Sequence, residues 1–353
     1  MRFVQGDGCD ILIHMPENIV FEKKNVLVTG GAGFIGSQLC EELLKEARVI
    51  CMDNFVNSSA FNIDHLLPYD DFEFVKHDVS VPFKLTDFPE IEKFAVEFQG
   101  VQEIYHLACP TSPKTFDKLK IQTLETNSLA MHNTLELARQ FKAKYLFASS
   151  SVVYGPPPGD GARFKEDDKG VVDHLSNRAC YDEGKRFGET YADTYRQVYG
   201  VQVQLARIFR TYGPRMQLRE GHLIPDFIID AIDGKDLVIY GDEKFSTSVS
   251  YVSDIVDALL RLMHLNEYIG PVNIGDDKRY LMSEIAQKII EMTGSSSQIR
   301  YEPPIEFLTS LGLPELPKAR EELGWVPLVR LEDGLRKTID YTMANKDALG
   351  VGK

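Results

Sequence analysis

The chain has 353 residues, of which 43% are hydrophobic and 26% are charged, and its formal net charge is −14. These proportions are ordinary for a globular protein, and the length favours one large domain or two closely packed ones. The negative charge argues against non-specific binding to nucleic acid, and an anionic substrate would require a local positive pocket. No apolar run reaches the roughly 18 residues of a membrane span, so we expect no membrane insertion.

The cysteine and histidine patterns predict neither disulfides nor a metal site. The five cysteines are odd in number, and none is paired in a C-x-x-C motif. The histidines show no spacing typical of metal ligands, so we predict no metal. A reducing compartment fits best, and we expect a cytoplasmic protein. Residues 1–24 contain acidic residues and no uninterrupted apolar segment, which argues against a secretory signal and indicates an N-terminal extension with one short strand at 10–15.

Strands and helices alternate through the first half of the chain, which predicts a parallel sheet with helices on both faces. A long loop rich in Pro, Gly and charge follows at 155–180, and shorter helices form the second half. The expected strands are 25–30, 48–54, 72–79, 101–108, 144–150 and 201–209, and the expected helices are 34–46, 119–141, 181–199, 223–233, 252–265, 282–293 and 331–345.

The predicted fold class is α/β: a Rossmann doubly wound parallel sheet with a smaller mixed C-terminal substrate lobe. We assign residues 1–24 to the N-terminal extension. The NAD-binding domain would comprise 25–207 and 248–275. The substrate lobe would comprise 208–247 and 276–345.

The sequence VLVTGGAGFIGSQL predicts a dinucleotide site. Gly30, Gly33 and Gly36 follow a strand and open a helix, where backbone without Cβ lets a pyrophosphate approach the helix N-terminus. Asp53 ends the next strand, where a carboxylate accepts hydrogen bonds from ribose hydroxyls and repels a 2′-phosphate. This favours NAD over NADP. Asp78, with Val79, follows the third strand and would lie near the adenine.

The segment CYDEGK carries a candidate base. Tyr181 and Lys185 are four positions apart at the start of a helix and therefore share one face. A tyrosine must ionise to remove a hydroxyl proton during hydride transfer, and roughly 4 kcal/mol separate it from ionisation at neutral pH. A lysine cation and a positive nicotinamide ring act in that direction. Ser150, at the end of a strand in SSSVVYG, would orient the substrate oxygen.

With these motifs, the sequence resembles the extended short-chain dehydrogenase/reductase family, which contains NAD-dependent nucleotide-sugar epimerases, dehydratases and decarboxylases. The resemblance covers roughly residues 24–345 and is carried by TGGAGFIG, YHLACPTSP, SSSVVYG, YDEGK, RIFRTYGPR and YVSDIVDAL. Within the family, these motifs most resemble those of the UDP-glucuronate decarboxylases. The resemblance implies a nucleotide-diphosphate sugar as substrate, tightly held NAD, and a homodimer paired through the helices at 119–141 and 181–199.

The resemblance also assigns site residues. Ser150, Tyr181 and Lys185 form the catalytic triad, with Asn127 behind the lysine and Ser112 near the sugar. The expected cofactor residues are Gly30, Gly33, Phe34, Ile35, Gly36, Asp53, Asn54, Asp78, Val79, Leu107, Ala108, Tyr181 and Lys185. The expected substrate residues are Pro110, Thr111, Ser151, Val152, Arg210, Thr211, Arg215 and Tyr240.

Three positions depart from the family pattern. Dehydratases carry an Asp-Glu pair after the triad serine, and decarboxylases carry a Glu in the second place, where this chain has Ser151 and Val152. Elimination of water needs a base and an acid, so these residues exclude 4,6-dehydration. The decarboxylases also have an arginine where this chain has Thr247, and relatives have an asparagine where it has Arg210. Arg210 can still bind phosphate through its guanidinium group.

A site equipped for oxidation at the sugar C4 leaves several outcomes open. We rank 4-epimerisation with return of the hydride first, UDP-glucuronate decarboxylation second, and release of a 4-keto sugar by a 4-dehydrogenase third. A non-catalytic, NAD-binding regulatory protein is the alternative from another class. Intact Ser150, Tyr181 and Lys185 argue against that alternative.

Overall fold

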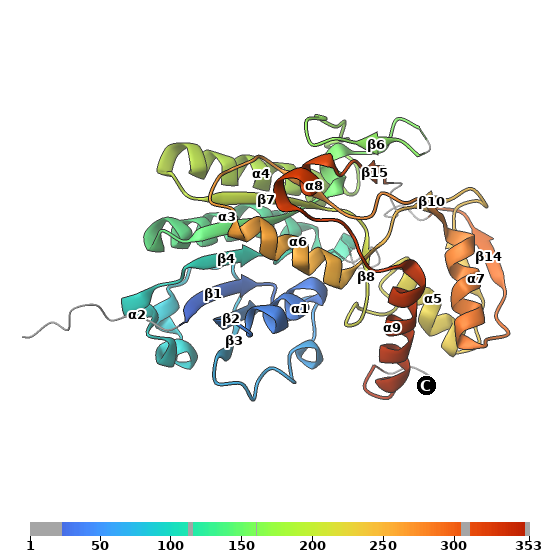
Figure 1. Ribbon diagram of the computed structural model, residues 1–353, viewed down its shortest axis with the longest axis horizontal. Helices are drawn as coiled ribbons and strands as arrows, with labels where there is room; N and C mark the ends of the chain where they lie inside the picture. The colour runs from blue at the N-terminus through green and yellow to red at the C-terminus, as the bar shows by residue number, and fades with distance from the viewer. Residues whose placement is uncertain (1–22, 112–115, 160, 305–310, 350–353) are drawn as a thin grey trace, which may run out of the picture.

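A seven-stranded parallel sheet forms the centre of the computed structural model, which describes residues 23–111, 116–159, 161–304 and 311–349 (Figure 1). Its strand order is β12-β7-β5-β4-β1-β2-β3. The strands are nearly continuous apolar runs because helices cover both faces of the sheet. They are β1 (Lys24–Thr29), β2 (Ala47–Asp53), β3 (Phe72–Lys76), β4 (Glu103–His106), β5 (Lys144–Ser150), β7 (Val203–Ile208) and β12 (Val272–Ile274).

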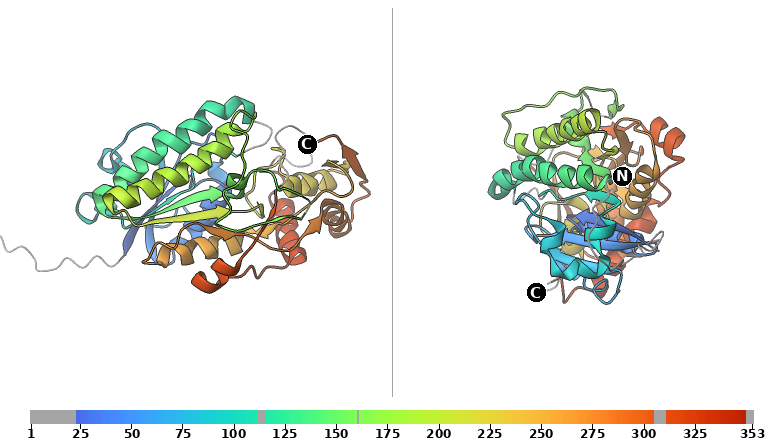
Figure 2. Two further views of the ribbon diagram at one scale, coloured as in Figure 1. Left: turned by 90° about the horizontal axis from the view of Figure 1, so that it is seen from above. Right: turned by 90° about the vertical axis from the view of Figure 1, so that its left-hand side faces the viewer.

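Two pairs of helices sandwich this sheet. On one face lie α1 (Phe34–Leu43) and α6 (Val252–His264), which bury apolar residues in one core cluster with the strands. On the other face lie α3 (Lys120–Phe141) and α4 (Ala179–Tyr199), which contribute to a second cluster. Figure 2 shows α3 and α4 running side by side along the outside of the molecule.

A smaller lobe continues from the carboxyl edge of the sheet. It contains α5 (Leu223–Ile232), α7 (Met282–Thr293) and α9 (Leu331–Ala344), beside the parallel pair β9 (Leu237–Tyr240) and β14 (Ile299–Glu302). The core under α1 and α6 runs without a break into this lobe. The domain boundaries given above stay a prediction.

The remaining elements are short. Two-stranded pairs join β8 (Thr211–Tyr212) to β11 (Ser250–Tyr251), β10 (Ser246–Thr247) to β13 (Tyr280–Leu281), and β6 (Arg163–Phe164) to β15 (Leu313–Pro314). The other helices are α2 (Val96–Gln99), α8 (Pro317–Leu323), η1 (Ala60–Asn62), η2 (Leu85–Asp87), η3 (Pro89–Phe94), η4 (Phe116–Leu119) and η5 (Ser151–Tyr154). Within the described ranges, no helix has both the length and the apolar character that crossing a bilayer requires.

The sequence predicted the α/β Rossmann fold correctly, and the differences lie at element ends and in short strands. The strand expected at 144–150 has those bounds, whereas the helix expected at 34–46 ends at Leu43. The helix of the YDEGK segment begins at Ala179, two residues earlier than expected. Neither β12 nor the pair β6 and β15 was predicted, since strands of two or three residues carry no readable periodicity.

Candidate active site

A cavity of about 350 Å³ lies along the carboxyl edge of the sheet. The strand order reverses between β1 and β4. The loops that follow these two strands therefore lead to opposite sides of the sheet and leave a crevice between them. Most of the residues that the sequence nominated line this one cavity. They are Gly30, Gly33, Phe34, Ile35, Gly36, Asp53, Asn54, Asp78, Val79, Leu107, Ala108, Pro110, Thr111, Ser150, Ser151, Val152, Tyr181, Lys185, Arg210 and Thr211.

The glycine-rich turn after β1 leaves space that only backbone can border. Gly30 has φ of +72°, and a Cβ there would come within 2.7 Å of the Ala108 nitrogen. A Cβ at Gly36 would collide with the carbonyl oxygen of Gly30. The N-cap residue of α1, Gly33, supplies no side-chain acceptor, so the first amide groups of this helix face the cavity uncapped. Such a helix start fits a pyrophosphate.

The carboxylate of Asp53 is fixed at the end of β2. Its Oδ1 accepts hydrogen bonds from the Phe55 amide at 2.9 Å and the Ser58 hydroxyl at 2.6 Å, and its Oδ2 accepts one from the Ala32 amide at 3.1 Å. Among the described residues, the lysine and arginine side chains that line the cavity are Arg178, Lys185 and Arg210. They lie on the opposite side of β1 from Asp53, so none of them is placed to attract a 2′-phosphate at the Asp53 end. This end therefore suits the ribose of NAD and opposes the 2′-phosphate of NADP.

Tyr181, Lys185 and Ser150 meet at the other end of the cavity. The Lys185 Nζ donates a hydrogen bond to the Ala148 carbonyl at 2.9 Å and lies 5.9 Å from the centre of the Tyr181 ring. The Ser150 side chain lies beside Tyr181 in this cavity and acts to lower the pKa of the phenol. The first turns of α4 thus bring the phenol and the ammonium to the end of β5, where a substrate hydroxyl could meet both hydroxyl groups.

Burial governs the protonation of this group. Burial raises the pKa of Tyr181 well above its ordinary value, with a smaller contribution from the Cys109 thiol, while the hydrogen bond with Ser150 acts in the opposite direction. Burial also lowers the pKa of Lys185. Below them, burial lowers the pKa of His106 to about 3, so this imidazole is neutral. A neutral phenol at rest needs additional positive charge beside it before it can act as a base.

The turn η5 brings small, uncharged side chains into the cavity. Ser151 and Val152 are both buried and both border the space beside Ser150. Asn127 lies behind the lysine, where its Nδ2 donates to the Cys109 Sγ at 3.3 Å. Neither Ser151 nor Val152 can act as the acid or base at a sugar carbon that a carboxyl group would provide.

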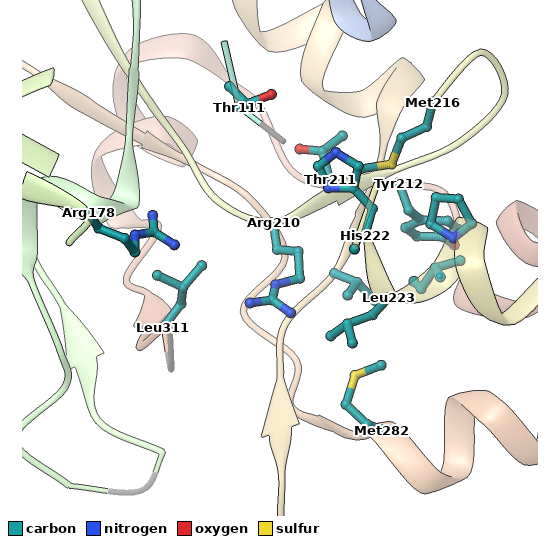
Figure 3. Close-up of a pocket in the computed structure, with 14 residues that line it drawn as sticks. Thr111, Arg178, Arg210, Thr211, Tyr212, Met216, His222, Leu223, Met282 and Leu311 are labelled. Atoms are coloured by element: carbon teal, nitrogen blue, oxygen red, sulfur yellow. The ribbon is translucent and has the colours of Figure 1, made fainter. Parts of the chain in front are cut away.

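A side pocket of about 130 Å³ opens from this cavity (Figure 3). Arg178, the N-cap residue of α4, and Arg210, between β7 and β8, line both spaces. Arg178 donates to an Asp182 oxygen at 3.1 Å, which anchors it to the first turn of α4. Burial, and next the charge of Arg178, lower the pKa of Arg210 to about 10. This part of the cavity therefore has a positive potential.

Arg215 and Tyr240 do not line the cavity. Arg215, whose backbone has φ of +69°, pairs instead with Glu41 of α1, and its Nη2 lies 3.1 Å from the His65 Nε2. Asn62 Nδ2 reinforces this junction by donating to the Ala32 and Arg215 carbonyl oxygens. Tyr240 is the last residue of β9, which pairs with β14. Ser112 and residues 1–22 lie outside the described residues.

Sequence reasoning overlooked two charged residues of the cavity, Arg178 and Glu125. Arg178 stood in a segment interpreted as loop, although its position three residues before Tyr181 places it at the start of the same helix. Glu125, on α3, carried no signal that distinguished it from a solvent-exposed helical residue. Thr247, where the family resemblance led us to expect an arginine, is buried and lines neither space.

The fold and cavity define a Rossmann-type enzyme that binds a dinucleotide beside a tyrosine and a lysine. Comparison with known sequences identifies the family: residues 26–275 match the NAD dependent epimerase/dehydratase family, and the chain belongs to it. It is an enzyme of the NAD-dependent nucleotide-sugar epimerase, dehydratase and decarboxylase type, and NAD is its cofactor.

Relatives and solved structures agree with this assignment. The chain is 39% identical to UDP-glucuronic acid decarboxylase 1 of Danio rerio over 321 residues, covering 91% of this chain and 73% of the relative. An epimerase of Methanothermobacter thermautotrophicus superposes with a TM-score of 0.82 at 28% identity, covering 93% of this chain and 95% of the other. The UDP-glucuronic acid 4-epimerase of Bacillus cereus, solved with UDP-glucuronic acid and NAD, gives 0.77 at 25% identity, covering 91% and 99%.

Proposed function

We propose that this enzyme oxidises C4 of a nucleotide-diphosphate sugar and then reduces it on the opposite face, which makes it a 4-epimerase. The observation that carries the proposal is the meeting of Tyr181, Lys185 and Ser150 in one cavity whose neighbouring turn offers Ser151 and Val152 in place of an acid. Oxidation at C4 requires only the first three residues, and hydride return requires space but no further acid.

The protein groups divide the work between binding and proton transfer. Ser150 orients the C4 hydroxyl, and the Tyr181 oxygen removes its proton as the C4 hydride departs. Lys185, held by the Ala148 carbonyl, favours the phenolate through its positive charge. Bound NAD would supply the hydride acceptor for the oxidation and the hydride donor for the reduction. Tyr181 then gives the proton back to the C4 oxygen, so the protein ends each turnover in its starting state.

Turning the 4-keto sugar over requires room beside the triad. The side chains of Ser151 and Val152 are smaller than the acids that other members of the family carry there, and both face the cavity. A glutamate at position 152 would extend into the space through which the ring must rotate. Both the missing acid and the added space therefore favour epimerisation.

Decarboxylation is the second candidate because several relatives that cover most of this chain are named UDP-glucuronic acid decarboxylases. Oxidising C4 of a glucuronate places the ketone β to the carboxylate, and such acids lose carbon dioxide with little assistance. Protonation of C5 would then have to use water or Tyr181, since η5 offers no carboxyl group. UDP-glucuronic acid is accordingly the first substrate to test for either reaction.

Product analysis separates these candidates. The purified protein is incubated with UDP-glucuronic acid, UDP-glucose and UDP-N-acetylglucosamine, and the products are identified by mass spectrometry and proton NMR. Epimerisation gives a product of unchanged mass in which the couplings of the C4 proton to its neighbours change from those of an axial to those of an equatorial proton, or the reverse. Loss of carbon dioxide indicates decarboxylation, and loss of two hydrogens indicates release of the 4-keto sugar. Unchanged substrates, with no change in the absorbance of the bound nicotinamide, would refute C4 oxidation.

We also propose a homodimer that pairs through α3 and α4. These helices lie side by side on the outside of the molecule (Figure 2). Both expose apolar side chains to solvent. Phe187 is 50% exposed, Val198 is 64% exposed, and Ile121 on α3 is 63% exposed. Large apolar side chains exposed on two neighbouring helices are typical of a protein interface. Val198→Asp should convert the dimer to a monomer in light scattering, and an unchanged mass would contradict the pairing.

A further inference from the structure

The side pocket holds more positive charge than C4 oxidation requires. Figure 3 shows Arg178 and Arg210 entering the same open space from different elements. None of the 14 lining residues within the described part of the chain is acidic. Apart from the two arginines and His222, its wall is largely apolar, with Leu223, Met282 and Leu311 among the lining side chains. Charges in such surroundings interact strongly because little water screens them.

The chemistry of this pocket suits an oxyanion. Each guanidinium presents parallel N–H donors that match the two oxygens of a carboxylate or a phosphate. Arg178 is already oriented by Asp182, so little side-chain freedom remains to be lost when an anion binds. Both guanidinium groups line this one pocket, so a single ligand can reach both, and the charge of Arg178 contributes to the lowered pKa of Arg210.

The position of Arg178 indicates which anion this is. Its guanidinium carbon lies 5.7 Å from the centre of the Tyr181 ring. An oxyanion bound to Arg178 is therefore close to the ring carbon whose hydroxyl meets Tyr181. In a hexuronate the carboxylate on C5 is adjacent to C4, whereas the diphosphate is attached at C1 on the far side of the sugar ring.

We propose that Arg178 and Arg210 hold the C6 carboxylate of a nucleotide-diphosphate hexuronate and thereby suppress its loss as carbon dioxide. This inference rests on the proposed C4 oxidation. When the 4-keto sugar decarboxylates, the C5–C6 bond breaks, its electron pair becomes the enolate of the C4 ketone, neutral carbon dioxide leaves, and C5 later takes a proton. The negative charge thus moves away from the carboxylate. Two cations on the carboxylate stabilise the starting state more than the transition state, so the ketone survives until the hydride returns.

The test measures how UDP-glucuronic acid divides between two products. The full-length protein with its NAD is compared with Arg210→Gln and Arg178→Gln, and the amounts of the 4-epimer and of the UDP-pentose are quantified. Because hydrogen bonds to charged groups contribute about 1.5–3 kcal/mol, each substitution should raise the pentose-to-epimer ratio by about tenfold or more. Arg210→Lys, which keeps the charge, should raise it less. Arg300→Gln, on the exposed strand β14, is the matched control and should leave the ratio unchanged.

The outcomes distinguish this inference from the proposed function. An unchanged ratio with equal losses of activity on UDP-glucuronic acid and UDP-glucose would place the arginines on the diphosphate and overturn the inference. A wild-type protein that converts UDP-glucuronic acid wholly to pentose would overturn it as well, although C4 oxidation would stand. If no sugar nucleotide is oxidised, the proposed function fails and the inference fails with it. Bound NAD and circular dichroism verify that each variant is folded, and Arg210→Lys tests the inference if a glutamine variant is not.

Discussion

The ion pair between Glu189 and Arg207 should be among the most sensitive positions outside the cavity itself. Both side chains are nearly buried, at 12% and 11% exposure. Glu189 accepts hydrogen bonds from the Arg207 Nε at 2.9 Å and Nη2 at 2.7 Å, and from the Ser149 hydroxyl at 2.6 Å. Arg207 also donates to the Tyr154 hydroxyl at 2.9 Å. The pair therefore joins α4, β5, β7 and η5. Glu189 lies one helical turn after Lys185, and its partner Ser149 immediately precedes Ser150.

Glu189→Gln keeps the shape of the side chain but leaves the buried charge of Arg207 without its carboxylate. Removing one partner of a buried pair costs about 3–5 kcal/mol. We expect this loss in the free energy of unfolding, measured by urea titration of the fluorescence of Trp325, the single tryptophan. Glu189→Met combined with Arg207→Met should cost less than Glu189→Gln, because no uncompensated charge remains.

A matched exposed pair provides the control. Asp257 and Arg261 on α6 lie 2.8 Å apart with side chains 46% and 45% exposed. Asp257→Asn should therefore cost less than about 1 kcal/mol. If Glu189→Gln were no more destabilising than Asp257→Asn, the argument that this ion pair holds the catalytic elements together would be wrong.

Four further outcomes test the site. Tyr181→Phe should retain NAD and lose turnover, and equal turnover in the variant would remove the phenol from the chemistry. Ser150→Ala should shift the rise of kcat with pH to higher pH, since the hydrogen bond with Ser150 lowers the pKa of Tyr181 and its loss raises the pKa at which the phenolate forms. An unshifted profile would contradict that role. Asp53→Ala should weaken binding of NAD more than that of NADP, which two titrations by fluorescence would measure. Gly36→Ala should prevent NAD from co-purifying, because its Cβ collides with the Gly30 carbonyl.

Local patterns carried most of what the sequence could predict. The glycine turn, Asp53 and the Tyr181–Lys185 pair each depend on residues close together in the chain, so spacing alone identified the residues that later met in one cavity. Ser150 followed from its place at the end of a strand, and the resemblance to a family added Ser151 and Val152 of η5.

Contacts between distant segments were beyond the reach of spacing. The substrate role predicted for Arg215 remains a prediction, and its guanidinium is engaged by Glu41, which lies far away in the sequence. Arg178 was hidden because a cap residue has no periodic partner, and its neighbour Arg210 comes from a different strand end. The pair β6 and β15 joins two-residue strands from opposite halves of the chain.

The junction around Arg215 ties the segment after β8 to α1 and to the glycine-rich turn after β1. Asn62 holds the turn that borders the pyrophosphate side and the turn that follows β8, and Gln38 of α1 donates to the Pro214 carbonyl at 3.0 Å. A substrate that shifts the segment after β8 must therefore strain contacts to the helix that receives the cofactor. Loading with NAD would stiffen this segment in advance, so the sugar nucleotide should bind to an already shaped surface, and cofactor exchange should be slowest while the sugar is bound.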